Sequence, residues 1–253
     1  MTDDPLPPLT VPARFCGPPH SANGGYTCGV LAQRLPQPAA RVTLHQPPPL
    51  DTAMSVVAHE DGLRATFGGA VLAAAEPAEL DLEPIEPVSW PEASAAARTY
   101  GGLHAHPFPT CFVCGTARQA PDALGLRPGM LANRPGTTAA AWRPDPALDR
   151  GDGHVGAEVI WAALDCPGGW TLDLTGRPAV LGRMTAQVDA LPVVGDACVV
   201  MGRMLGKERR KSFTATTLYD GDGRVLARAH AVWIDVDPRR LRPPEERRHR
   251  RRI

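Results

Sequence analysis

The sequence lacks several features that mark well-known classes of protein. No apolar run approaches the ~20 residues that a membrane-spanning helix needs, so we expect no membrane partner. The first residues, 1–5, have neither the basic start nor the apolar stretch of a secretory signal, and we expect a cytoplasmic protein. No Gly-x-Ser-x-Gly turn and no P-loop are present, which argues against an α/β-hydrolase and a nucleotide-dependent enzyme.

Positive charge is sparse outside the carboxyl-terminal tail. The chain has 27 basic and 27 acidic residues, but arginine is densest in residues 237–253. The remainder is mildly acidic, so we expect no nucleic-acid partner. The Arg-rich tail is typical of a disordered, solvated terminus, although it could also touch an anionic surface.

Proline divides the chain into segments. Residues 1–13 are rich in proline and are expected to be disordered. Residues 76–110 contain six prolines, which remove backbone donors, and this stretch is expected to be a connector with one short helix near 92–98. Two candidate folded units remain, at 14–75 and 111–236.

The second unit shows the clearer pattern. Apolar residues from Val155 to Leu164 recur at helical spacing, and Pro167 is expected to stop or redirect this helix. A strand is expected before the helix at 137–142. Strands are expected after it at 180–191, 197–205, 212–219 and 224–234, with a hairpin turn at 220–223. The order predicts an α+β fold with the helix as the core of an antiparallel sheet.

The first unit repeats this order in a shorter form. A helix is expected after Asn23-Gly24-Gly25, and strands follow at 41–44, 53–59, 63–67 and 70–73. We infer an internal duplication. The two sheets could pair edge to edge, which would cover edges that otherwise promote aggregation.

These patterns resemble the hotdog fold of the acyl-CoA thioesterase and dehydratase superfamily. The resemblance rests on the helix that ends in Asp165, the strand entry Leu191–Asp196 and the hairpin from Asp220. The segment Phe15–Tyr26 resembles the amino-terminal repeat of double-hotdog thioesterases. The resemblance implies two tandem hotdog-like repeats, each a central helix wrapped by an antiparallel sheet.

The resemblance also implies site residues. In related thioesterases an acidic residue on the central helix acts as general base or nucleophile, and Asp165 matches it. Gly156 lies at the spacing of a glycine turn in one branch, but the histidine of that branch is absent. Thr185 is a loose match for the threonine of the double-hotdog branch, whose glutamine has no counterpart, with His230 nearby.

Each candidate also has a simpler structural interpretation. Asp165 at a helix end can activate water if burial raises its pKa, or it can merely bond backbone amides of the turn that follows. Asn23, Gly24 and Gly25 can present amides to an oxyanion, or can form an ordinary helix cap. His20 can orient substrate or be simply exposed.

Two further clusters, one of basic residues and one of cysteines and histidines, are candidate binding sites. Arg209, Arg210 and Lys211 lie in a basic loop that can hold the phosphates of coenzyme A, or can be a solvated hairpin. Cys111 and Cys114 have the spacing of a metal knuckle, and His104 and His106 are weak further candidates. No second cysteine pair follows, so we expect no zinc and no cofactor beyond the coenzyme A part of a substrate.

Three functions remain open at this point. The first is hydrolysis of an acyl-CoA or related acyl thioester. The second is a non-catalytic acyl-thioester-binding protein with a degenerate site. The third is an enoyl-thioester hydratase or dehydratase, for which His154 and His230 are the local histidines. The partner in each case is a small acyl thioester, and the sequence allows a homodimer.

Overall fold

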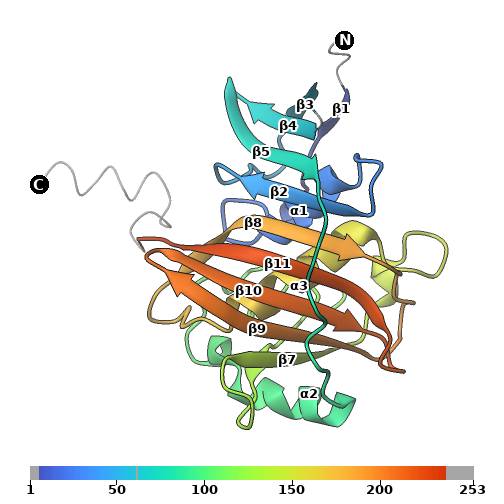
Figure 1. Ribbon diagram of the computed structural model, residues 1–253, viewed down its shortest axis with the longest axis vertical. Helices are drawn as coiled ribbons and strands as arrows, with labels where there is room; N and C mark the ends of the chain where they lie inside the picture. The colour runs from blue at the N-terminus through green and yellow to red at the C-terminus, as the bar shows by residue number, and fades with distance from the viewer. Residues whose placement is uncertain (1–5, 61, 238–253) are drawn as a thin grey trace, which may run out of the picture.

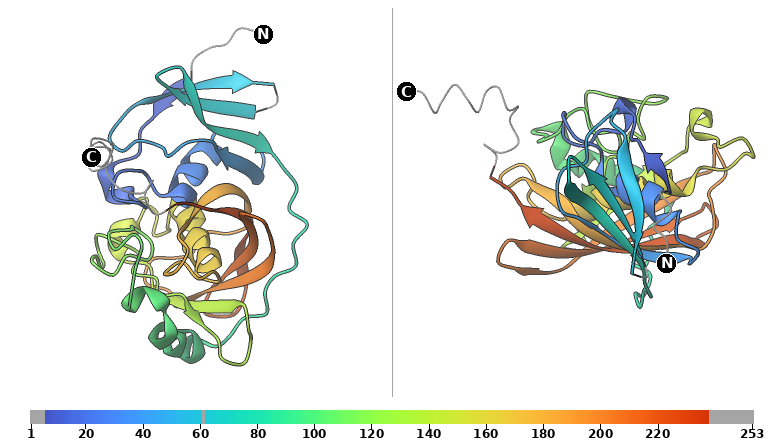
Figure 2. Two further views of the ribbon diagram at one scale, coloured as in Figure 1. Left: turned by 90° about the vertical axis from the view of Figure 1, so that its left-hand side faces the viewer. Right: turned by 90° about the horizontal axis from the view of Figure 1, so that it is seen from above.

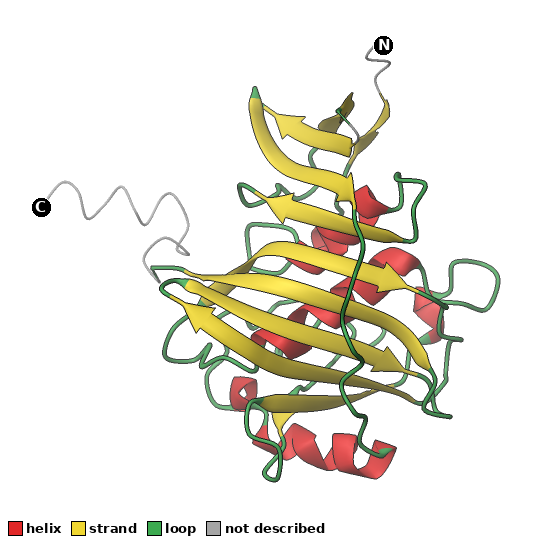
Figure 3. Ribbon diagram, in the orientation of Figure 1, coloured by secondary structure: helices red, strands yellow, loops and turns green. Residues whose placement is uncertain are grey.

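The computed structural model describes residues 6–60 and 62–237 and shows one large antiparallel sheet with few helices (Figures 1 and 3). The strands are β1 (Leu6–Leu9), β2 (Ala39–Leu44), β3 (Met54–His59), β4 (Gly62–Phe67), β5 (Ala70–Pro77), β6 (Gly129–Met130), β7 (Thr137–Trp142), β8 (Ala179–Val188), β9 (Cys198–Glu208), β10 (Lys211–Tyr219) and β11 (Val225–Asp235). The helices are α1 (Gly24–Ala32), α2 (Trp90–Ala96) and α3 (Ala157–Gly169). The strand order is β1-β3-β4-β5-β2-β8-β11-β10-β9-β7-β6, which confirms the expected α+β class.

The sheet curves around α3, and α1 lies beside α3 on the same side of the sheet (Figure 2). Helix α3 contacts strands β7 to β11, whereas α1 contacts β2, β5 and β8. From Val159 to Gly169 every residue of α3 is buried, so its stability comes from tertiary packing on all sides. Pro167 was expected to stop or redirect this helix, and the first alternative is wrong. The helix continues to Gly169 because the surrounding strands hold its last turn, where Thr138 Oγ1 donates to the carbonyl of Pro167 at 2.7 Å.

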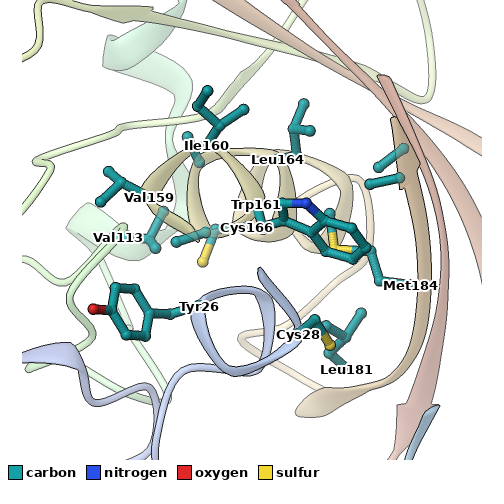
Figure 4. Packing of buried hydrophobic residues seen from close by; sticks show 14 of the residues in the cluster. Tyr26, Cys28, Val113, Val159, Ile160, Trp161, Leu164, Cys166, Leu181 and Met184 are labelled. Carbon is teal, nitrogen blue, oxygen red and sulfur yellow. The ribbon is translucent and has the colours of Figure 1, made fainter. Parts of the chain in front are cut away.

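Helices α1 and α3 approach each other closely because glycine faces the contact. A Cβ atom on Gly25 would lie 2.5 Å from the carbonyl oxygen of Trp161, and one on Gly29 would lie 2.7 Å from Cα of Glu158. Buried apolar side chains, including Cys28 and Trp161, fill the space around this contact (Figure 4). The close approach brings the start of α1 next to the second half of α3.

Strands β2 and β8 join the two halves of the sheet. They pair antiparallel, with Val42 opposite Met184. The edge-to-edge pairing that the sequence suggested therefore occurs, and it makes one continuous sheet. Both α1 and α3 lie behind this junction (Figure 1).

Two segments are more ordered than the sequence predicted. Residues 6–9, expected to be disordered, form β1, because Leu6 and Leu9 pair with β3 and Leu9 is buried. The connector crosses the outer face of the sheet (Figure 1), where Ile85 is buried and its amide donates to Thr217 Oγ1 at 3.1 Å. The Arg-rich tail from residue 238 onward lies outside the described residues. Among the helices of the described chain, none has the length and apolar character needed to cross a membrane.

Candidate active site

A cavity of about 640 Å³ opens where the first turn of α1, the second half of α3 and the loop after η3 (Gly101–Leu103) meet. Asn23 and Gly24 line it from α1, and Asp165 lines it from α3. The ends of β8 and β11 form another part of its wall. Both halves of the chain therefore contribute to one cavity.

Asp165 is the buried acidic residue of this cavity. Only 3% of its surface is exposed. Its Oδ2 atom accepts two hydrogen bonds, from Asn23 Nδ2 and from the Gly25 amide, each at 3.1 Å. Its Oδ1 atom is buried and has no hydrogen-bond partner among the described residues. One carboxylate oxygen is thus fixed and the other remains available to a ligand.

The local sequence explains this arrangement. Asn23 caps α1, because its Oδ1 accepts from the Tyr26 amide at 2.8 Å, and this leaves its Nδ2 group to face Asp165. Gly25 brings its amide within reach of the carboxylate because a side chain there would collide with Asp165 Cβ at 2.6 Å. Gly25 therefore both lies in the first turn of α1 and allows α1 and α3 to approach closely.

The environment of Asp165 raises its pKa from 3.8 to about 7. Burial is the main cause, since it disfavours the charged form. The hydrogen bonds from Gly25 and Asn23 act in the opposite direction, because they favour the carboxylate. The side chain therefore changes charge near neutral pH, where a general base is most effective.

Three cysteine thiols gather beside the carboxylate. Cys111, Cys114 and Cys166 are buried, and their sulfur atoms all lie within 4.8 Å of one another. Asn23 Nδ2 lies 4.0 Å from Cys111 Sγ, so the asparagine amide contacts both this thiol and Asp165. The sequence had singled out Cys111 and Cys114, but it gave no sign that Cys166 would join them.

The structure places Thr185 and Gly156 outside the lining of the cavity. Thr185 lies on the outer face of β8, where Arg41 Nε donates to its Oγ1 at 3.4 Å, and it does not line the cavity. Its neighbours Met184 and Ala186 are the fully buried ones, because alternate residues of a strand face opposite sides. Gly156 caps the far end of α3, about 13 Å from Asp165 at 1.5 Å per residue.

The basic loop lies at the end of the sheet where the cavity opens. Lys211 pairs with Ile234, and Ile234 and Val236 both line the cavity. Arg209 and Arg210 form the turn between β9 and β10, and Arg210 Nη2 donates to the carbonyl of Asp235 at 2.9 Å. These cations therefore border the cavity without lining it.

The histidines divide into two groups. His20, which is exposed, and His106, which is half-buried, line the cavity. His104 is exposed and lies outside the thiol group and the cavity lining. His154 pairs with Asp152 in an exposed loop, and His230 stacks on Phe213, so neither local candidate for hydratase chemistry reaches the cavity.

Several lining residues escaped the sequence analysis. Cys166 directly follows Asp165 on α3, far along the chain from Cys111 and Cys114, so no spacing in the sequence linked it to them. Trp170 and Trp233 pack in the core and also line the cavity. His45 and Gln46 follow β2, where the sequence carried no pattern that pointed to a site.

Comparisons with known proteins show the fold. No protein-family model matches the chain, and no curated protein matches it by sequence. A candidate thioesterase from Novosphingobium aromaticivorans superposes with a TM-score of 0.62 at 14% identity, over 91% of this chain and 95% of that one. The tesB protein of Mycobacterium avium subspecies paratuberculosis gives 0.58 at 12% identity, over 90% and 91%.

A third solved structure names the fold directly. A conserved protein of unknown function with a hotdog fold, from Alicyclobacillus acidocaldarius, gives a TM-score of 0.57 at 15% identity, over 91% of this chain and 93% of that one. The chain therefore has the hotdog-type α+β fold over most of its length, as the resemblance implied. At these identities the similarity establishes the fold, and the chemistry has to be argued from the site itself.

Proposed function

We propose that this protein hydrolyses an acyl-CoA or a related acyl thioester, with Asp165 as general base or nucleophile. The observation that carries the proposal is a buried carboxylate that lines a cavity, with Oδ2 held by two donors and Oδ1 unpartnered. A carboxylate fixed in this way can take a proton from a water molecule placed beside Oδ1, or can attack the thioester carbonyl with that oxygen.

The start of α1 supplies a donor for the developing oxyanion. The amides of Gly25 and Tyr26 already donate to Asp165 and Asn23. The Gly24 amide belongs to the first turn, where backbone N–H groups have no acceptor within their own helix. Gly24 lines the cavity, so its N–H is the group that we assign to the thioester oxygen in the transition state.

The surroundings of the cavity fit an acyl thioester of coenzyme A. A volume of about 640 Å³ is within the range of small-molecule sites, and Leu174, Leu181 and Trp233 supply apolar wall for an acyl chain. Arg209, Arg210 and Lys211 border the cavity, where their charges can hold the phosphates. His20 at the exposed rim is placed to contact the polar part of the ligand.

We further propose that the chain contains two hotdog repeats that arose by internal duplication. Each half has a helix packed on the strands that follow it, and β2 and β8 join the halves. The proposed site lies between the repeats, since Asn23 and Gly25 come from the first and Asp165 from the second. Such a shared site requires both repeats for activity.

The test is thiol release by the full chain. The purified protein is incubated with acyl-CoAs of increasing chain length, and free coenzyme A is followed with a thiol reagent against a protein-only blank. Turnover with at least one acyl group, lost in Asp165→Asn, is the expected result. Absence of turnover with every acyl-CoA, at protein concentrations that bind them, would contradict hydrolysis.

One observation favours a second candidate, a non-catalytic acyl-thioester-binding protein. Thr185, the residue that the resemblance linked to catalysis, faces away from the cavity. A binding protein of this kind would bind acyl-CoA in calorimetry with the same affinity in wild type and in Asp165→Asn, and would release no thiol. Thiol release and acyl-CoA binding, each measured on wild type and on Asp165→Asn, therefore distinguish the two functions.

A further inference from the structure

The geometry points to a metal site built from the thiols of Cys111, Cys114 and Cys166, and we propose Zn²⁺ as the ion it takes. The three sulfur atoms lie within 4.8 Å of one another, and Cys111 Sγ is 3.9 Å from Cys166 Sγ. Zinc–sulfur bonds of about 2.3 Å at tetrahedral angles place sulfur atoms about 3.8 Å apart. The thiols are therefore close to the spacing that one ion requires.

The three ligands come from two separate, well-supported segments. Cys111 and Cys114 belong to a tight turn, closed by the Gly115 amide, which donates to the Cys111 carbonyl at 2.9 Å. The Cys114 carbonyl accepts from Tyr100 Oη at 2.7 Å, which fixes the second half of the turn. Cys166 projects from the buried helix α3. A bidentate knuckle plus one thiolate from a helix is an arrangement that metal ions stabilise across a fold.

Hydrogen-bond donors surround the sulfur atoms, as thiolate ligands need. Asn23 Nδ2 is a donor 4.0 Å from Cys111 Sγ. Trp170 Nε1 donates to Cys114 Sγ at 3.4 Å. Three thiolates and one Zn²⁺ leave a net charge of −1, and these donors compensate that buried charge. Binding displaces the three thiol protons to solvent.

His106 assists the site without being a ligand. Its Nδ1 atom accepts a hydrogen bond from the Phe108 amide at 2.9 Å, so Nε2 carries the proton in the neutral ring. Nε2 lies 3.1 Å from the carbonyl oxygen of Cys114 and 3.4 Å from its Sγ atom, where it acts as a donor. The ring is held by edge contacts with Tyr100 and Trp170. This position differs from the sequence-based suggestion of His106 as a metal ligand.

The fourth coordination position faces the cavity. All three cysteines line it, and no fourth Cys, His, Asp or Glu of the described residues joins the group. Structural zinc sites are closed by four protein ligands, whereas sites that exchange ligands have three and an open position. The proposed ion would therefore accept a water molecule or an anion from the cavity. Such an ion could bind whether or not the protein hydrolyses thioesters.

The experiment uses the full chain, reduced and freed of metal by a chelator. After addition of Zn²⁺ and desalting, elemental analysis should give about one equivalent per chain. Co²⁺ in place of Zn²⁺ should produce a sulfur-to-cobalt charge-transfer band in the near ultraviolet and visible bands of a tetrahedral ion. Azide should shift the visible bands, because it can enter an open position.

The matched variants are Cys166→Ala and Cys198→Ala. Both residues are buried thiols, but Cys198 lies on β9 and is not part of the group. Cys166→Ala should lose the charge-transfer band, and Cys198→Ala should keep it. If reduced wild-type protein retains no Zn²⁺ and shows no charge-transfer band, the proposal is overturned. This result does not depend on whether the variants fold. Equal metal content in both variants would place the ion elsewhere, and bands unmoved by azide would overturn the open position.

A disulfide between Cys111 and Cys166 is the competing fate of these thiols. Mass spectrometry of protein handled without reductant distinguishes the two outcomes. A Cys111–Cys166 crosslink in protein that takes up no metal when reduced would overturn the metal site in favour of a redox pair. Protection of the three thiols by Zn²⁺ against that crosslink would support it.

Discussion

Replacing Asp165 by asparagine separates the charge of this side chain from its shape. The amide oxygen can accept both hydrogen bonds that Oδ2 accepts from Asn23 and Gly25. The new amide nitrogen takes the place of Oδ1, which has no partner to lose. The fold should therefore be retained, while the group that acts as base or nucleophile is removed. We expect turnover of acyl-CoA to fall by about 10²–10⁴-fold, the usual contribution of a positioned base.

The same substitution should change how stability depends on pH. Burial raises the pKa of Asp165 from 3.8 to about 7. Between those values the folded protein keeps a proton that the unfolded chain has lost, so the free energy of unfolding of the wild type falls as pH rises. At about 1.4 kcal/mol per pKa unit, this cost is roughly 2 kcal/mol at pH 5 and roughly 4 kcal/mol at pH 8. Asparagine does not titrate and carries neither cost.

Urea unfolding at pH 5 and pH 8, with reductant and chelator present, measures the effect. Relative to wild type, Asp165→Asn should gain about 2 kcal/mol more at pH 8 than at pH 5. The comparison across pH cancels the intrinsic difference between the two side chains. Asp222→Asn, in an exposed turn, should show no such change. A stability difference that is equal at both pH values, or unchanged turnover, would refute the assigned state of this carboxyl.

Further predictions concern the contacts around the site. Gly29→Ala should destabilise the protein by about 1–3 kcal/mol in urea unfolding, since its Cβ would lie 2.7 Å from Glu158 Cα, whereas Gly206→Ala has open space and should not. Asn23→Ala should reduce kcat at least about tenfold and move the acid limb of the pH profile upward, because its hydrogen bond lowers the pKa of Asp165. A pH profile of kcat that does not move would contradict an effect of the Asn23–Asp165 hydrogen bond on this pKa. Arg209→Ala with Arg210→Ala should raise the Kd for coenzyme A severalfold and weaken its salt dependence; an unchanged Kd would remove the loop from binding.

Much of the fold could be predicted because its signals are local. The strands expected at 137–142 and 212–219 occur in the structure with bounds that agree within one residue. The turn at 220–223 and the Asn23 cap of α1 mark where elements end and begin. The order of the elements was enough to place one helix against one sheet.

The candidate site could be predicted only in part, because it depends on contacts between distant elements. Asp165 and Asn23 were singled out separately, but nothing in the sequence shows that they lie 3.1 Å apart. Cys166 was missed because the cysteine pair was considered only with its sequence neighbours. Thr185 was chosen by resemblance, although strand alternation places Met184 in the core around α3 and turns Thr185 to the other face of the sheet.

The two edge strands of the sheet affect how readily one molecule associates with another at high concentration. Because β2 joins β8, the outermost strands of the described sheet are β1 and β6. Strand β1 contains Pro7 and Pro8, which cannot donate to an incoming strand, and β6 is only two residues long. Neither border can template a further strand over any useful length. We therefore expect this protein to resist edge-to-edge association at concentrations where a sheet with a long unpaired edge strand would associate.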